Sequence, residues 1–167
     1  SREPVYPLGE ISLSEYLKLW AEATPDKPAL VYYGTEVTFQ ELDDLSNRFA
    51  SLLQLKGLKK GDRVAVYLGN CPQFYIAFHG ILKCGCVHVP VNPMFKKAEL
   101  LYELNDSDAL VIVALDHLYP VVQAVRSQTS LQEVITTHIS DFLPREPIIP
   151  VHPSLKAQEP ECPGSID

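Results

Sequence analysis

Residues 78–93 constrain the fold of this chain more than any other stretch. They read Phe-His-Gly-Ile-Leu-Lys-Cys-Gly-Cys-Val-His-Val-Pro-Val-Asn-Pro. This is the pattern of an apolar helix end, a glycine that stops the helix, a short strand and a rigid Asn-Pro exit. A helix that passes through one glycine into a strand is typical of proteins in which helices and strands alternate. The sequence therefore predicts a sheet whose strands are linked by helices.

The same alternation extends over most of the chain. Helical spacing of apolar residues predicts helices at 14–23, 39–56, 74–83, 97–104 and 117–126. Strands are predicted at 28–33, 36–38, 63–68, 86–91, 109–114 and 133–136, the first two forming a hairpin. The unbroken apolar run at 109–114 is typical of a strand covered on both faces. We therefore expect an α/β fold, a mostly parallel sheet with helices on both faces.

Local signals indicate where individual helices begin and end. Thr38 and Glu41 match the capping-box pattern at the start of the longest helix. Asn70, two residues before Pro72, is expected to cap the next helix. The Asn-Asp-Ser-Asp run at 105–108 is expected to form a loop.

The net charge of −7 gives no overall field that would attract nucleic acid, so nucleic acid is not an expected partner. Apolar runs such as 109–115 are far shorter than the roughly 20 residues that a membrane-spanning helix needs. The first residues lack a signal-peptide pattern, and four cysteines do not make a secreted disulfide framework. A cytoplasmic protein, or one bound peripherally to a membrane, is expected.

The pattern of helices and strands ends near residue 139, and prolines become frequent after it. We therefore expect residues 1–140 to form one α/β subdomain. Residues 141–167 are predicted to be a Pro-rich linker or a tail that lies along the surface.

The run Cys84-Gly-Cys86-Val-His88 comes closest to a metal-binding pattern. A structural zinc site normally needs a second, separated pair of ligands, and the sequence offers none at a suitable spacing. The favoured interpretation is that the cysteines are buried as small hydrophobic residues. The sequence predicts no metal site.

Signals for catalysis are equally weak. Cys71 lies near the start of a predicted helix, but no pattern pairs it with a histidine base. The strand–glycine–helix junction at 68–70 could present amides to an anion, although a lone glycine there is usually only a turn residue. Since no pair of carboxylates is spaced for acid–base work, no catalytic residue is assigned.

Two lysines are harder to dismiss. Lys96 and Lys97 open a predicted helix directly after the Asn92-Pro93 exit. A helix N-terminus already carries positive potential, so two ammonium groups there are not explained by the helix itself. The two lysines could belong to a solvated surface or to an anion-binding site, and the sequence leaves both interpretations open.

In their order and spacing, the segments resemble the N-terminal region of the adenylate-forming superfamily. That superfamily includes acyl- and aryl-CoA synthetases, adenylation domains of peptide synthetases and luciferases. The resemblance extends over roughly residues 12–140. It rests on the order and spacing of a segment that starts at Pro25 and of residues 37–42, 58–68, 70–74, 80–85, 89–93 and 99–107, rather than on any one of them. The Val-Pro-Val-Asn-Pro exit at 89–93 is most similar to that of fatty-acyl-CoA ligases.

The resemblance implies the N-terminal subdomain of the adenylate-forming ligase fold. It also implies a parent enzyme that joins a carboxylic acid, of the fatty-acid type, to coenzyme A through an acyl-adenylate. ATP, Mg²⁺ and coenzyme A belong to that parent, and none is assigned to this chain. Lys96 or Lys97 would meet a phosphate of coenzyme A, although Met94 stands where the family pattern has a basic residue.

Several motifs of that superfamily have no counterpart in these 167 residues: the Gly-rich phosphate loop, the Tyr-Gly-x-Thr-Glu segment, the ribose-binding aspartate and the domain with the catalytic lysine. The chain is therefore expected to be an N-terminal fragment, inactive alone, whose partner is the remainder of the ligase. Peripheral membrane association and a homodimer both stay open. One alternative is a stand-alone, non-catalytic α/β binding module. Another is a flavodoxin-like domain, which would require either a bound flavin or a phosphorylated aspartate at a strand end, for which Asp116 is the candidate.

Overall fold

The computed structural model describes residues 5–6, 9–151, 153 and 161–166. Within them, helices alternate with strands as the sequence predicts. In chain order the elements are α1 (Leu13–Ala23), β1 (Pro28–Tyr32), β2 (Thr35–Thr38), α2 (Phe39–Leu55), β3 (Arg63–Tyr67), α3 (Pro72–Cys84), β4 (Val87–Pro90), α4 (Lys97–Ser107), β5 (Val111–Leu115), the 3₁₀ helix η1 (Asp116–Leu118), α5 (Tyr119–Arg126) and β6 (Glu133–Thr137).

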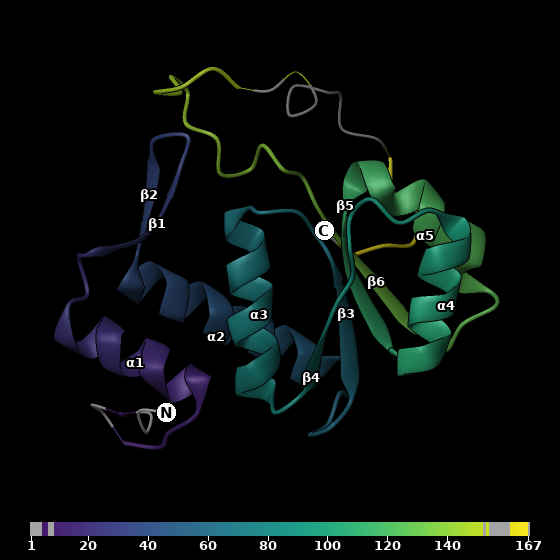
Figure 1. Ribbon diagram of the computed structural model, residues 1–167, viewed down its shortest axis with the longest axis horizontal. Coiled ribbons are helices and arrows are strands. Elements are labelled where there is room, and N and C mark those ends of the chain that lie inside the picture. Colours follow the sequence, from purple (N-terminus) through teal and green to yellow (C-terminus); the bar gives the residue numbers. More distant parts are fainter. Residues whose placement is uncertain (1–4, 7–8, 152, 154–160, 167) are drawn as a thin grey trace.

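The main sheet has four strands in the order β4-β3-β5-β6, and every pair in it is parallel. β1 and β2 form a separate antiparallel hairpin, as predicted. Figure 1 shows the sheet between two layers, with α2 and α3 on one side and α4 and α5 on the other. The prediction of an α/β fold with a mostly parallel sheet covered on both faces is confirmed.

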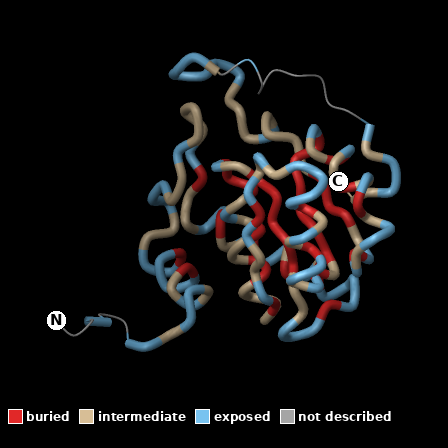
Figure 2. The backbone as a smooth tube through the Cα atoms, turned by 45° about the vertical axis from the view of Figure 1, so that its right-hand side comes forward, coloured by how far each residue is buried: buried red, intermediate tan, exposed pale blue. Residues whose placement is uncertain are grey.

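Alternate residues of the central strands explain how both faces become buried. Val64 and Val66 of β3 pack into the core on the side of α2 and α3. Ala65 and Tyr67 pack into the core on the side of α4 and α5. Successive side chains of a strand point to opposite faces, so an unbroken apolar run serves both layers. The buried residues in Figure 2 accordingly concentrate in the strands.

Helices α2 and α3 approach each other closely at Gly80. A Cβ atom at this position would lie 2.7 Å from Cδ1 of Phe49 and 2.9 Å from the backbone oxygen of Ser46. Both distances are shorter than side chains tolerate, so only glycine fits here without a shift of α2.

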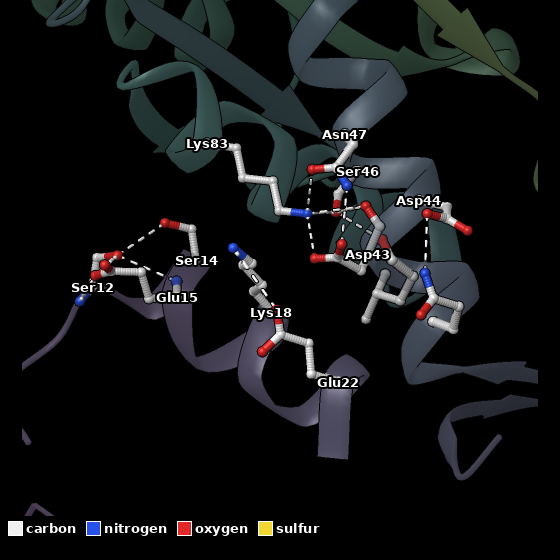
Figure 3. A network of polar contacts seen from close by, with 12 residues as sticks. Ser12, Ser14, Glu15, Lys18, Glu22, Asp43, Asp44, Ser46, Asn47 and Lys83 are labelled. Atoms are coloured by element: carbon white, nitrogen blue, oxygen red, sulfur yellow. Dashed lines mark hydrogen bonds and ion pairs between the residues drawn. The ribbon is translucent and has the colours of Figure 1, made fainter. Parts of the chain in front are cut away.

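A buried polar contact joins the same two helices. The Lys83 ammonium of α3 lies 2.7 Å from Oδ1 of Asp43 and also donates to Ser46 and Asn47 of α2, each at 2.8 Å (Figure 3). The two charged side chains are only 11% and 13% exposed. Because the ammonium has several acceptors, the burial of its charge is compensated by hydrogen bonds.

The helix starts agree with the sequence in one case and differ in another. At α2, the hydroxyl of Thr38 accepts from Glu41 N, and Thr38 N donates to the Glu41 carboxylate, which confirms the predicted capping box. At α3, the prediction that Asn70 is the cap was wrong. Cys71 occupies the cap position without a side-chain hydrogen bond to the helix, and Pro72 is the first helical residue. Proline needs no amide partner in the first turn, so the helix starts without a polar cap.

The end of α4 also differs from the prediction. The predicted loop at 105–108 was wrong, because α4 continues through Ser107. The Ser107 hydroxyl donates to the carbonyl oxygen of Glu103, one turn back. This hydrogen bond satisfies the hydroxyl within the helix, so serine is tolerated at this position. Asp108 then takes a left-handed conformation with φ 47°, which ends the helix as Asn and Asp often do.

After β6 the chain runs across the carboxyl end of the sheet toward the hairpin (Figure 1). Phe142 packs against a small core formed by Leu17, Val37 and Leu42, and Ile148 N donates to Tyr33 O. Farther on, Ile166 forms a parallel bridge with Ile135 of β6. The division into a subdomain at 1–140 and a tail at 141–167 stays a prediction. Among the described helices, none has the length and apolar character needed to cross a bilayer.

Candidate functional site at the carboxyl edge of the sheet

The four parallel strands place all their carboxyl ends at one edge of the sheet. From this edge the chain continues to α3 after β3, but to α4 and α5 on the opposite face after β4 and β5. The helices that follow β4 and β5, the two neighbours of β3, therefore lie on the opposite face of the sheet from the helix that follows β3. Ligands of open α/β sheets bind where the connections change face in this way, at the carboxyl ends of the strands.

Lys96 and Lys97 lie at this edge, at the start of the helix that the sequence predicts after the Asn92-Pro93 exit. Lys96 is the N-cap residue of α4 and Lys97 is its first helical residue. Lys96 N donates to the Glu99 carboxylate at 3.1 Å. Both lysine side chains are exposed, and within the described ranges no carboxylate forms an ion pair with either ammonium. Two such cations at the N-terminus of a helix can attract an anion.

The loop that carries these lysines is held by specific contacts. The side-chain oxygen of Asn92 accepts from Met94 N at 3.0 Å, and Asn92 O accepts from Phe95 N at 2.9 Å. The hydroxyl of Tyr67, at the end of β3, donates to Phe95 O. Burial, with a further contribution from the charge of Glu99, raises the pKa of Tyr67. The Asn-Pro exit is thus a fixed turn, which positions the start of α4.

A second polar group lies at the same edge. The sequence indicated Asp116 as a candidate, but not its pairing with His138. Asp116 directly follows β5 and His138 directly follows β6. The Asp116 carboxylate is buried and lies 3.5 Å from Nε2 of His138, while its other oxygen accepts from His117 N at 2.7 Å. Nδ1 of His138 contacts the Ser140 hydroxyl. A polar residue immediately after a buried strand was the available signal, since neighbouring parallel strands end side by side.

This second group stabilises loops rather than presenting a free carboxylate. Both oxygens of Asp116 have partners, and Gln73 of α3 donates to the backbone oxygen of His138 at 2.8 Å. The segment after β6 is thereby tied to both β5 and α3. Asp116 therefore does not present the free carboxylate that a phosphorylated aspartate requires, which argues against that form of the flavodoxin-like alternative.

Cys71 and the junction before it do not form a nucleophilic site. Cys71 is 2% exposed, and burial is the main reason why the pKa of its thiol is raised, although amides of Phe74 and Gln73 act in the opposite direction. A raised pKa disfavours the thiolate that a nucleophile needs. A Cβ atom placed at Gly69 would meet no described atom within 4 Å, and the residue has an ordinary φ, which favours a simple turn.

The residues of the Cys-x-Cys-x-His run separate into different environments. Cys84 is the last residue of α3, Cys86 lies in the core, and the ring of His88 packs edge-on against Phe74 and Phe78. Burial lowers the pKa of His88, so the ring is neutral near pH 7. In the part of the chain that the structure describes, no three His, Cys, Asp or Glu side chains are grouped to hold a metal ion.

Comparisons with known proteins agree with this architecture. The family model described as "AMP-binding enzyme" matches residues 17–164. A long-chain-fatty-acid–CoA ligase of Bacillus subtilis is 38% identical over 83% of this chain, and one of Salmonella typhimurium is 41% identical over 79%. The chain spans about a quarter of the length of these relatives, 25% and 24% respectively.

A solved structure gives the same picture. The N-terminal domain of FACL13 from Mycobacterium tuberculosis superposes with a TM-score of 0.69 at 31% identity. That superposition covers 75% of this chain and 33% of the other. The fold of this chain is thus similar to that of this N-terminal domain.

Proposed function

Because the chain belongs to the AMP-binding enzyme family, we propose that it acts as the N-terminal part of an AMP-forming ligase that joins a fatty acid to coenzyme A. Its match to ligase N-terminal regions is the observation that carries this proposal. The fatty-acid substrate is suggested by relatives that are named long-chain-fatty-acid–CoA ligases.

The proposed reaction of the whole ligase has two steps. In the first, a carboxylate oxygen attacks the α-phosphorus of ATP, the bond to the β-phosphate breaks, and acyl-adenylate and pyrophosphate form. In the second, the thiol of coenzyme A loses its proton and attacks the acyl carbon, and AMP leaves. The family's motifs for the triphosphate are absent from this sequence, and the described residues group no metal ligands. No part of the first step is therefore assigned to this chain.

For the second step the chain offers an anion-binding position. Lys96 and Lys97 are exposed, without an ion-pair partner among the described carboxylates, and stand at the N-terminus of α4. Lysine binds phosphate as a point charge, and the helix terminus adds amide donors and positive potential. We therefore assign these two residues the binding of a phosphate of coenzyme A.

The first expected result concerns the chain alone. The purified 167-residue protein should show no carboxylate-dependent exchange of pyrophosphate into ATP, because the groups that stabilise charge on the phosphates lie outside it. Joined to the remaining residues of the Bacillus subtilis relative, it should support exchange with long-chain fatty acids. Exchange above background by the isolated chain would contradict the assignment as an incomplete ligase.

The second expected result concerns the two lysines in that joined enzyme. Replacement of Lys96 and Lys97 by alanine should raise the KM for coenzyme A roughly tenfold, which corresponds to about 1.4 kcal/mol. The exchange reaction, which does not use coenzyme A, should be unchanged. Replacement of Lys59 and Lys60, near the opposite edge of the sheet, serves as the matched control.

Dephospho-coenzyme A, which lacks the 3′-phosphate, makes the test specific. If the lysines bind that phosphate, the double alanine variant should use dephospho-coenzyme A as well as the unchanged enzyme does. An equal loss with both thiols would exclude the 3′-phosphate as the bound group. An unchanged KM for coenzyme A would refute any role of these lysines in its binding.

A further inference from the structure

Two thiols lie next to each other where α3 passes into β4. The sulfur atoms of Cys84 and Cys86 are 3.4 Å apart, and both cysteines are free. This place is at the lower end of α3 in Figure 1, away from the carboxyl edge of the sheet. It therefore belongs to no part of the site described above.

The backbone around the pair is fixed by hydrogen bonds. Gly85 takes a left-handed conformation with φ 77°, which turns the chain between the two cysteines. Gly85 O accepts from Gly61 N at 2.9 Å, and Cys86 N donates to Ile81 O at 3.0 Å. The fold holds the two thiols as neighbours, so little further conformational entropy is lost when they react with each other.

The two sulfurs differ in their access to solvent. Cys84 is partly exposed, whereas Cys86 is 5% exposed and points its sulfur toward the backbone oxygen of Lys59 at 3.5 Å. Burial, together with the contact to Cys84, raises the pKa of Cys86 to about 12. A reagent from solvent will therefore meet Cys84 first. Cys86, which its high pKa keeps protonated, can react only once an oxidised Cys84 beside it offers a leaving hydroxyl group that takes up its proton.

We propose that Cys84 and Cys86 are a redox-sensitive thiol pair, which a peroxide converts reversibly into an intramolecular disulfide. The thiolate of Cys84 attacks one oxygen of hydrogen peroxide, the O–O bond breaks, and hydroxide leaves as water after protonation. The product is a sulfenic acid on Cys84. The sulfur of Cys86 then displaces the hydroxyl group, which takes up the Cys86 proton and leaves as a second water. The thiols lose two electrons and the peroxide gains them.

The geometric change that this reaction needs is small. The sulfurs must move from 3.4 Å to the disulfide bond length of about 2.0 Å. Glycine between the cysteines has no side chain to resist the adjustment, and even a Cβ atom at this position would first meet the flexible Lys60 side chain, at 3.3 Å. Among the described residues, the only polar contact of the Cys86 sulfur besides Cys84 is the weak one to Lys59 O, which the disulfide would replace.

The other two cysteines provide matched controls. Cys71 lies at the opposite end of α3, where its sulfur contacts Gly69 O. The sulfur of Cys162 lies 3.8 Å from the backbone oxygen of Asp116. Both belong to the carboxyl edge, remote from the proposed pair.

The test uses the full chain, reduced and then treated with an equimolar amount of hydrogen peroxide. After alkylation of remaining thiols, the peptide that contains Cys84 and Cys86 should lack both alkyl groups and have lost two hydrogen atoms. Dithiothreitol should restore two alkylatable thiols. The disulfide should persist in Cys71→Ser and Cys162→Ser and be absent from Cys84→Ser and Cys86→Ser. A bond from Cys84 or Cys86 to another cysteine, or retention of both free thiols, would overturn the proposal.

A second measurement avoids reliance on a variant that changes the core. Phenylarsine oxide, whose trivalent arsenic bridges two adjacent thiolates, should bind to the unchanged chain in a one-to-one ratio. A dithiol should release it and a monothiol should not. Failure of the unchanged chain to bind the arsenical would show that the two sulfurs cannot reach one atom, which would refute the pair.

Discussion

Replacement of Lys83 by methionine should lower the free energy of unfolding by about 3 kcal/mol, within the usual range for breaking a buried ion pair. The Lys83 side chain is 11% exposed, and its ammonium lies 2.7 Å from the Asp43 carboxylate. Methionine keeps most of the stem but leaves that carboxylate buried without its partner. The contacts to Ser46 and Asn47 disappear as well. Urea unfolding followed by circular dichroism measures the loss.

A matched control is available on α1. Lys18 forms an ion pair with Glu22 at 3.8 Å, but the two side chains are 67% and 61% exposed. Lys18→Met should therefore change stability by no more than about 0.5 kcal/mol. Adding Asp43→Leu to Lys83→Met should recover part of the loss, because no isolated charge then remains buried. If Lys18→Met and Lys83→Met lowered the free energy of unfolding equally, the buried network would contribute no more to stability than an exposed ion pair.

Gly80→Val should destabilise the chain by about 3 kcal/mol, at the upper end for an overpacked core. The added Cβ would stand 2.9 Å from the backbone oxygen of Ser46, and a backbone atom can move only with the whole of α2. The substitution therefore separates α2 from α3 and strains the Lys83 network, which bridges the same helices. Thermal and urea unfolding should both report the change.

Gly69→Val is the corresponding control. Within the described part of the chain, no atom lies within 4 Å of a Cβ position at Gly69, so the larger side chain meets open space. A change within about 0.5 kcal/mol is expected, as for most surface substitutions. If Gly80→Val were as stable as the unchanged chain, the close approach of α2 and α3 would not need glycine.

Features of the fold that depend on neighbouring residues were readable from the sequence. The capping box at Thr38 and Glu41, the hairpin and the apolar strand β5 each arise from residues a few positions apart. The prediction for the end of α4 was wrong because residue type alone was a misleading signal there. Asn, Asp and Ser are typical of loops, but in this helix Ser107 satisfies its hydroxyl locally and Asp108 supplies the stop.

Contacts between distant residues were beyond a reading of local patterns. Lys83 and Asp43 are 40 positions apart, and the sequence does not say which of 14 basic residues meets which of 21 acidic ones. Asp116 and His138 meet only because β5 and β6 are neighbours in the sheet. Lys96 and Lys97 could be placed, since the Asn-Pro exit and the helix start are adjacent to them.

The strand order β4-β3-β5-β6 also bears on how the chain reaches its structure. In this sheet, at least one helix lies in the chain between the two strands of every pair. The strands can therefore pair only after that segment has been synthesised, and no local hairpin can start the sheet. β3, at the centre, acquires its second neighbour only when β5 has been synthesised more than forty residues later. Such long-range pairing slows folding, and it leaves the apolar residues of β3 uncovered in the meantime. During synthesis, α2 and α3, whose pairing involves nearer residues, are therefore the part best placed to shield that strand first.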